Sequence, residues 1–214
     1  MSAAYSYPQP SGRQSSETSR RVVGGLQVLG ILVGLMWISE VLDTALGHRL
    51  DAYGIEARDM DGLVGIVTAP FLHLGFGHLI SNTIPLVTLG IFIAIGGAYR
   101  LLMVTAGVAL ISGIGTWLTS PSFTVTIGAS GLVFGYATYL IVRGIFNRKL
   151  GQLAIGVGVI LVWGGALLGG LLPQDGISFQ GHLFGAIGGI LVAWLLASRD
   201  RKQKTPAQGP TYYS

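Results

Sequence analysis

Long apolar segments, separated by short polar ones, make up most of this sequence. Crossing a bilayer takes about 20 predominantly apolar residues. On that measure we predict six membrane-spanning helices, at 22–46, 78–98, 101–119, 130–145, 150–172 and 180–198. The pattern therefore predicts an all-α membrane protein whose six-helix bundle occupies residues 22–198.

Polar segments flank this bundle and divide it once. Residues 1–21 are rich in Ser, Pro and Gln and are predicted to form a disordered tail. Residues 47–77 form the longest connection between two spans, and residues 199–214 form a second, basic tail. No cleavage site for a secretory signal peptide clearly ends the first apolar segment.

The composition agrees with a membrane protein. Only 10% of the residues are charged, against roughly a quarter in soluble domains. The 34 glycines favour close packing of membrane helices. There is no cysteine, which excludes disulfides, thiolate metal sites and cysteine nucleophiles. The net charge is +4, but the basic residues lie beside apolar segments, so nucleic acid is not an expected partner.

The distribution of lysine and arginine predicts the orientation. If the N-terminus is cytoplasmic, only Arg49 and Arg58 lie outside. The other eleven lie inside: Arg13, Arg20, Arg21, Arg100, Arg143, Arg148, Lys149, Arg199, Arg201, Lys202 and Lys204. This bias predicts that both termini are cytoplasmic and that 47–77 is an extracytoplasmic loop.

With this topology, the second, fourth and sixth spans begin near the outer face. Their first turns carry His78, Asn82, Ser130 and His182, and polar groups at membrane depth are costly unless paired or hydrated. Only 12 uncharged residues separate Ser130 from Arg143. The fourth span is then about 20 Å long, so Ser130 lies about 10 Å below the outer surface. We expect residues 119–129 to dip into the protein as irregular backbone.

These residue types are suited to acyl transfer. Ser130 is a candidate nucleophile, and His182 is the candidate base that would take its proton. His78 and Asn82, four residues apart on one helix face, are candidate donors to an oxyanion. Small residues allow the fourth and sixth spans to approach and leave room for a substrate backbone; they are Gly128, Gly131, Gly135, Gly185 and Gly189. No carboxylate has clear access to His182, which favours a dyad.

Three motifs on the second, fourth and sixth spans resemble those of the rhomboid intramembrane serine proteases. They are HLGFGHLISN (73–82), GASG (128–131) and GHLFGAIGG (181–189). The resemblance implies that Ser130 is the nucleophile and His182 the base, and that His78 and Asn82 stabilise the oxyanion. It also implies that His73 orders the first loop. A bacterial plasma-membrane protease that cleaves transmembrane substrates, without metal or cofactor, is the expected function.

Two positions depart from the family pattern. Many members carry a Trp-Arg pair in the first loop, and the corresponding stretch DMDGLVGIVTAPFLH has none. Many also place tyrosine four residues after the serine, where this chain has Phe134. Phenylalanine still allows stacking on the imidazole but supplies no hydroxyl.

Two other classes of function are consistent with parts of the pattern. A transporter or a non-catalytic binder of transmembrane helices also places polar residues at membrane depth, although no inverted repeat is visible. A metalloenzyme would use His73, His78 and His182, but no buried carboxylate completes such a zinc set.

Overall fold

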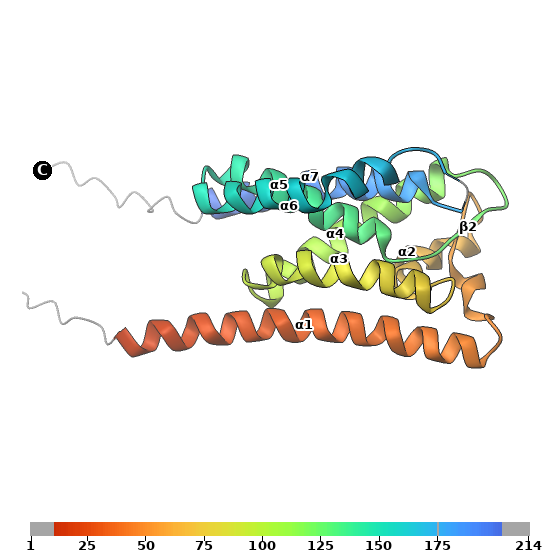
Figure 1. Cartoon of the computed structure of the whole chain (residues 1–214), viewed down its shortest axis with the longest axis horizontal. Helices are drawn as coiled ribbons and strands as arrows, with labels where there is room; N and C mark the ends of the chain where they lie inside the picture. The colour runs from red at the N-terminus through yellow and green to blue at the C-terminus, as the bar shows by residue number, and fades with distance from the viewer. Residues whose placement is uncertain (1–10, 175, 203–214) are drawn as a thin grey trace, which may run out of the picture.

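The computed structural model describes residues 11–174 and 176–202, with side chains for 15–174 and 176–199. Long helices lie side by side and form a bundle (Figure 1). They are α1 (Ser11–Ala45), α3 (Phe76–Ala94), α4 (Ala98–Thr119), α5 (Ser130–Asn147), α6 (Leu150–Gly170) and α7 (Phe179–Lys202). The described ends of α1 and α7 lie at one end of the bundle, opposite β2 (Figure 1). The prediction of a helical membrane bundle is therefore confirmed.

Five of the described helices are long and apolar enough to cross a membrane, and α5 is not one of them. The reason lies in its surroundings, because α5 packs against α3, α4, α6 and α7. Tyr136, Tyr139 and Leu140 on this helix have no exposed surface. A helix enclosed by other helices is selected for packing against protein, so hydropathy identifies it poorly.

The first helix is longer than predicted. It begins at Ser11, so the predicted disordered tail 1–21 is wrong for residues 11–21, while residues 1–10 lie outside the described part. Residues 15–20 are exposed. The start of the apolar segment predicts where lipid contact begins, and a polar helix can extend beyond that point.

The second connection is tighter than predicted. Helix α3 ends at Ala94 instead of residue 98, and α4 begins at Ala98 instead of residue 101. Between them, Gly97 has a φ of 95°, a conformation that glycine adopts at little cost. The smaller shifts at the ends of the other spans are of the size expected for helix termini.

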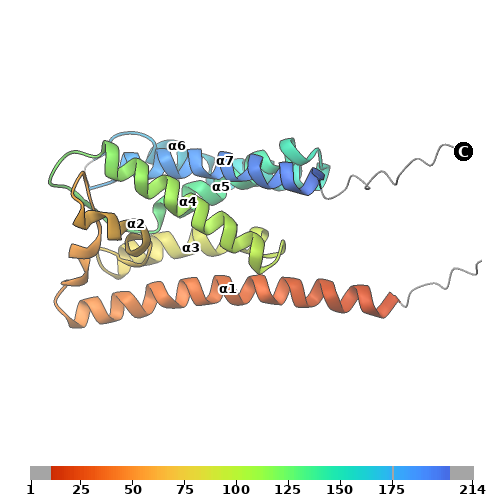
Figure 2. The ribbon, with the colours of Figure 1, turned by 180° about the vertical axis from the view of Figure 1, so that it is seen from behind.

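The first loop is an ordered structure. It contains η1 (Leu50–Tyr53), β1 (Ile55–Glu56), η2 (Asp61–Val64), α2 (Gly65–Thr68) and η3 (Ala69–Phe71). Strand β1 pairs antiparallel with β2 (Val125–Thr126), which links the loop to the segment before α5. Figure 2 shows this loop, including α2, at one end of the bundle.

Contacts to α4 hold this loop in place without a Trp-Arg pair. The indole of Trp117 donates a hydrogen bond of 2.7 Å to the carbonyl of Asp59. The guanidinium of Arg58 donates to the Ser122 hydroxyl at 2.7 Å and to the Leu118 carbonyl at 3.3 Å. The loop and the end of α4 therefore form one structural unit above the bundle.

Candidate active site

Helices α5 and α7 touch through their glycines. A methyl group on Gly185 would overlap the backbone of Gly131, and one on Gly189 would overlap the carbonyl oxygen of Gly135. Gly131 and Gly135 lie four residues apart on α5, and Gly185 and Gly189 lie four residues apart on α7. Each helix therefore presents its two glycines on one face. Because no side chain separates the backbones, the first turn of α5 lies directly beside the first turn of α7.

His182, in the first turn of α7, is held on two sides. Its Nδ1 lies 2.7 Å from the Gly170 carbonyl at the end of α6. A carbonyl only accepts, so Nδ1 carries the proton and the Nε2 atom of the neutral ring is left to accept one. The Phe134 ring, one turn after Ser130, stacks on the imidazole at 4.1 Å between centroids. Contacts from α5 and α6 thus set both the tautomer and the plane of the ring.

Ser130 is the first residue of α5 and is partly buried. It borders a cavity of about 30 Å³, whose polar lining includes Ser112, Thr116 and Ser178. The Thr116 hydroxyl is buried and has no hydrogen-bond partner among the described residues. A cavity of this size holds about one water molecule, provided that polar groups line it. A small hydrated space beside the serine is therefore physically reasonable.

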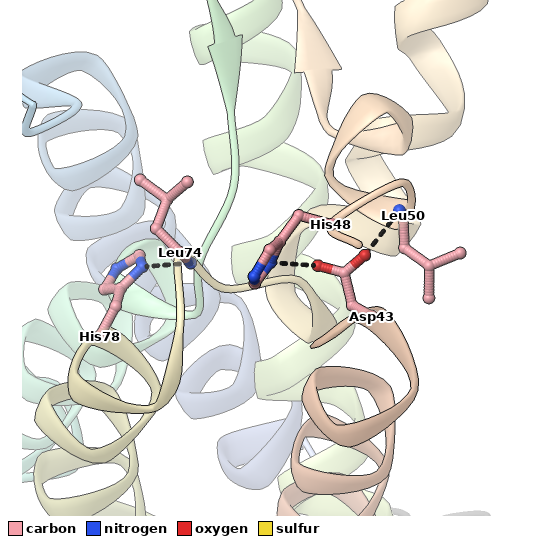
Figure 3. A network of polar contacts seen from close by, with 5 residues as sticks. All are labelled: Asp43, His48, Leu50, Leu74 and His78. Carbon is pink, nitrogen blue, oxygen red and sulfur yellow. Dashed lines mark hydrogen bonds and ion pairs between the residues drawn. The ribbon is translucent and has the colours of Figure 1, made fainter. Parts of the chain in front are cut away.

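His78 and Asn82 converge on the backbone just before Ser130. The Leu74 amide donates to Nδ1 of His78 at 3.2 Å, so the neutral ring carries its proton on Nε2 (Figure 3). A methyl group on Gly128 would lie 3.0 Å from that Nε2 and 3.7 Å from Nδ2 of Asn82. Two N–H-bearing atoms therefore lie beside Gly128, although Nδ2 of Asn82 also donates to the His78 carbonyl at 3.1 Å.

His73 fixes the same stretch of backbone from the loop side. Its Nε2 accepts a hydrogen bond of 3.4 Å from the amide of Ala129, the residue before Ser130. The ring is 1% exposed and lies edge-on to His78 at 5.1 Å. Burial, and to a lesser degree the neighbouring His78 ring, lower the pKa of His73 to about 4. His73 is thus a neutral acceptor at physiological pH.

The predicted residues lie at one end of the bundle, but the pair at its centre is not joined. Among the described residues, no hydrogen bond links the Ser130 hydroxyl to His182. Hydrogen bonds of this kind often form only when a substrate is bound. The Gly170 carbonyl and the Thr116 hydroxyl were not predicted from the sequence, since neither residue type signals a role by itself.

The geometry does not support a metal site formed by the three histidines. The only group of described residues close enough to share a metal ion is Asp43, His48 and Asp51. His73, His78 and His182 do not form such a group. In addition, His73 and His78 each use one ring nitrogen to accept a hydrogen bond from a backbone amide.

The fold and the site define a class, the multi-pass helical membrane proteins with a polar site enclosed between their helices. Residues 61–199 match the Rhomboid domain family, so the chain belongs to the rhomboid family. An uncharacterized protein of Mycobacterium tuberculosis is 41% identical over 92% of this chain and 87% of the relative. Another from Mycobacterium leprae is 41% identical over 93% and 83%. The rhomboid protease GluP of Bacillus subtilis is 30% identical over 60% of this chain and 25% of the relative.

Proposed function

We propose that this protein is an intramembrane serine endopeptidase in which Ser130 and His182 form a catalytic dyad. The observation that carries the proposal is the state of His182. Its Nδ1 donates to Gly170, its ring is stacked on Phe134, and its Nε2 is left as a base beside the helix turn that begins with Ser130. Family membership and a relative named as a rhomboid protease support the same conclusion.

In the first half of the reaction, the Ser130 hydroxyl attacks the carbonyl carbon of the scissile peptide bond. Its proton passes to Nε2 of His182, and the carbonyl oxygen becomes an oxyanion. Collapse of the tetrahedral intermediate breaks the C–N bond, and the leaving amine takes the proton from His182. The enzyme is left as an ester on Ser130.

The oxyanion would be stabilised by the donors that face Gly128. Nε2–H of His78 lies beside this position, and so does the Asn82 amide, which has a second N–H besides the one that it donates to the His78 carbonyl. The Ser130 backbone N–H, at the start of α5 where amides have no partner within the helix, is the third candidate. Donors already aimed at the developing charge lower the barrier because they need no reorganisation.

In the second half of the reaction, a water molecule hydrolyses the ester. His182 takes a proton from the water as its oxygen attacks the ester carbon. Collapse of this second tetrahedral intermediate breaks the bond between the acyl carbon and the Ser130 oxygen, which takes the proton back from His182, and the carboxyl product leaves. The cavity beside Ser130, with the unpartnered Thr116 hydroxyl in its lining, is a suitable reservoir for this water. The apolar bundle around it otherwise excludes solvent.

We propose further that α5 crosses the membrane as a sixth span within the bundle and that both termini are cytoplasmic. Arg21, Arg100 and Arg199 support this orientation, because they line one cavity of about 350 Å³. The positive-inside bias supports a cytoplasmic location for that end and a location of the candidate site toward the outer face of the plasma membrane. Transmembrane segments that enter from the outer leaflet are the proposed substrates.

The test uses a single-pass model substrate and a fluorophosphonate probe with the purified full chain. Ser130→Ala and His182→Ala are expected to abolish both cleavage and labelling, whereas the control Ser39→Ala on α1 retains both. Circular dichroism shows whether each variant is folded. Cleavage by either folded site variant would disprove the dyad, and absence of labelling in the wild type would favour a non-catalytic binder of transmembrane helices.

A further inference from the structure

A cluster of acidic side chains lies where α1 ends and the first loop begins. Gly47 and His48 both have positive φ values, 66° and 60°, and they turn the chain back onto the helix. Asp43 lies at the centre of this turn. Its Oδ1 accepts a 2.7 Å hydrogen bond from the Leu50 amide, and its Oδ2 lies 3.3 Å from Nδ1 of His48 (Figure 3).

The turn also brings Asp51 to Asp43 and His48. One ligand atom from each of these three residues lies within 4.8 Å of the other two. Oδ1 of Asp51 is buried and has no hydrogen-bond partner among the described residues. Two carboxylates and an imidazole therefore lie close together, and Oδ1 of Asp51 is a buried acceptor among them without a partner.

Glu40 supplies an independent observation. It lies one helical turn before Asp43, is 1% exposed, and neither of its carboxylate oxygens has a hydrogen bond among the described residues. The Gly75 amide and the Thr44 hydroxyl lie nearby without forming bonds of normal geometry. Its strongest electrostatic neighbours are Asp43 and His48, and it also interacts with Asp51. A buried carboxylate that interacts with two other acids is costly unless a cation neutralises it.

Protein side chains supply little of that positive charge. The basic group that pairs with one of these carboxylates is His48. Arg58, in the same loop, donates its hydrogen bonds to Ser122 and Leu118 instead. One half-exposed imidazole does not compensate three carboxylates.

We propose that Asp43, His48 and Asp51 bind a divalent cation, with Zn²⁺ as the best match, and that the buried Glu40, one helical turn before Asp43, turns in as the fourth ligand. Zn²⁺ takes four ligands from imidazole nitrogen and carboxylate oxygen at about 2.0–2.2 Å. Tetrahedral ligands are then about 3.3 Å apart, which small side-chain rotations of Asp43, His48 and Asp51 would achieve from spacings within 4.8 Å. Mg²⁺ and Ca²⁺ prefer sites of oxygen alone, and the imidazole disfavours them.

The bound ion would be structural. It would join the outer end of α1 to the loop, close to Gly75, the residue before α3. His73 and His78 lie within three residues of that glycine, so the ion would also steady the segment that carries them. The proposal does not depend on the proposed protease activity, because binding is measured directly.

The experiment is calorimetric titration of Zn²⁺ into the full chain, purified in detergent and stripped with EDTA. One Zn²⁺ per chain is expected, with weaker binding of Mg²⁺ and Ca²⁺. Glu40→Gln and His48→Ala should each weaken Zn²⁺ binding at least tenfold. Asp61→Asn, an exposed acid in the same loop, is the matched control and should leave the affinity unchanged. Zn²⁺ should raise the Tm of the wild type and of this control only.

Three results would overturn the proposal. The first is absence of Zn²⁺ binding to the folded wild type, and the second is unchanged affinity in His48→Ala, whose exposed side chain is expendable for folding. The third is loss of binding in His182→Ala with full binding in His48→Ala, which would place the ion at the other histidines. If Glu40→Gln does not fold, the comparison of His48→Ala with Asp61→Asn decides alone.

Discussion

The Phe134 ring lies flat against the imidazole of His182, with centroids 4.1 Å apart and planes inclined by 7°. Both rings are largely buried, at 6% and 7% exposure. Phe134 follows Ser130 by one helical turn, so the stacking couples the helix that carries the serine to the one that carries the base. The tyrosine hydroxyl found at this position in many relatives is not needed for that contact.

Replacing Phe134 tests this coupling. Phe134→Leu removes the stacking while keeping an apolar side chain, and Phe134→Tyr keeps the stacking. Aromatic pairs contribute about 0.5–1.5 kcal/mol beyond their buried area, so we expect kcat to fall about tenfold in the leucine variant. KM should change little, and the tyrosine variant should remain active. Steady-state cleavage of a model substrate measures both. Full activity in Phe134→Leu would show that Gly170 alone orients the base.

The glycine contact between α5 and α7 predicts a large effect from one methyl group. In Gly185→Ala the new Cβ would overlap the carbonyl of Gly131, so the helices must separate. Overpacking of this kind costs about 1–3 kcal/mol, and a lower Tm in detergent is expected. Gly165→Ala on α6 is the matched control, because nothing lies within 4 Å of its added Cβ. Equal Tm values for the two variants would contradict the close approach.

The lowered pKa of His73 predicts loss of stability in acid. An unfolded histidine takes up a proton below about pH 6.5, whereas the folded His73 does so only near pH 4. The stabilisation of the fold is thus complete above pH 6.5 and declines as the pH falls to 4. The upper limit for this group is about 3 kcal/mol.

The measurement is Tm as a function of pH for the wild type and His73→Gln. Glutamine keeps a hydrogen-bond acceptor for the Ala129 amide but does not titrate. The variant should therefore show a shallower decline between pH 6.5 and 4. Parallel curves for the two proteins would mean that His73 does not contribute to acid sensitivity.

The Thr116 hydroxyl tests the role of the cavity beside Ser130. It has no hydrogen-bond partner among the described residues, so Thr116→Val removes a polar group without breaking a bond of the fold. If the cavity supplies water for hydrolysis of the ester, turnover should fall about tenfold, a cost of about 1.4 kcal/mol. Labelling of Ser130 by the fluorophosphonate should keep its rate, since that step needs no water. Slower labelling would indicate a change in the site itself.

The sequence by itself determined the membrane class, most of the spans, the family and the candidate residues. Hydropathy reports the free energy of transfer into lipid, which each segment carries locally, so lipid-facing helices were predictable within a few residues. The same measure placed the beginning of α1 too late, because a polar helix needs no lipid, and it marks α5, predicted from the short apolar segment 130–145, less clearly than the other spans.

Only the tertiary structure decided which groups meet. The Gly170 carbonyl that sets the tautomer of His182 belongs to another helix, and the Leu74 amide that sets that of His78 precedes α3. The pairing of β1 with β2 and the approach of Asp51 to Asp43 and His48 likewise depend on turns and packing. Backbone carbonyls and amides are present at every residue, so their role arises from position in space and leaves no signal in the sequence.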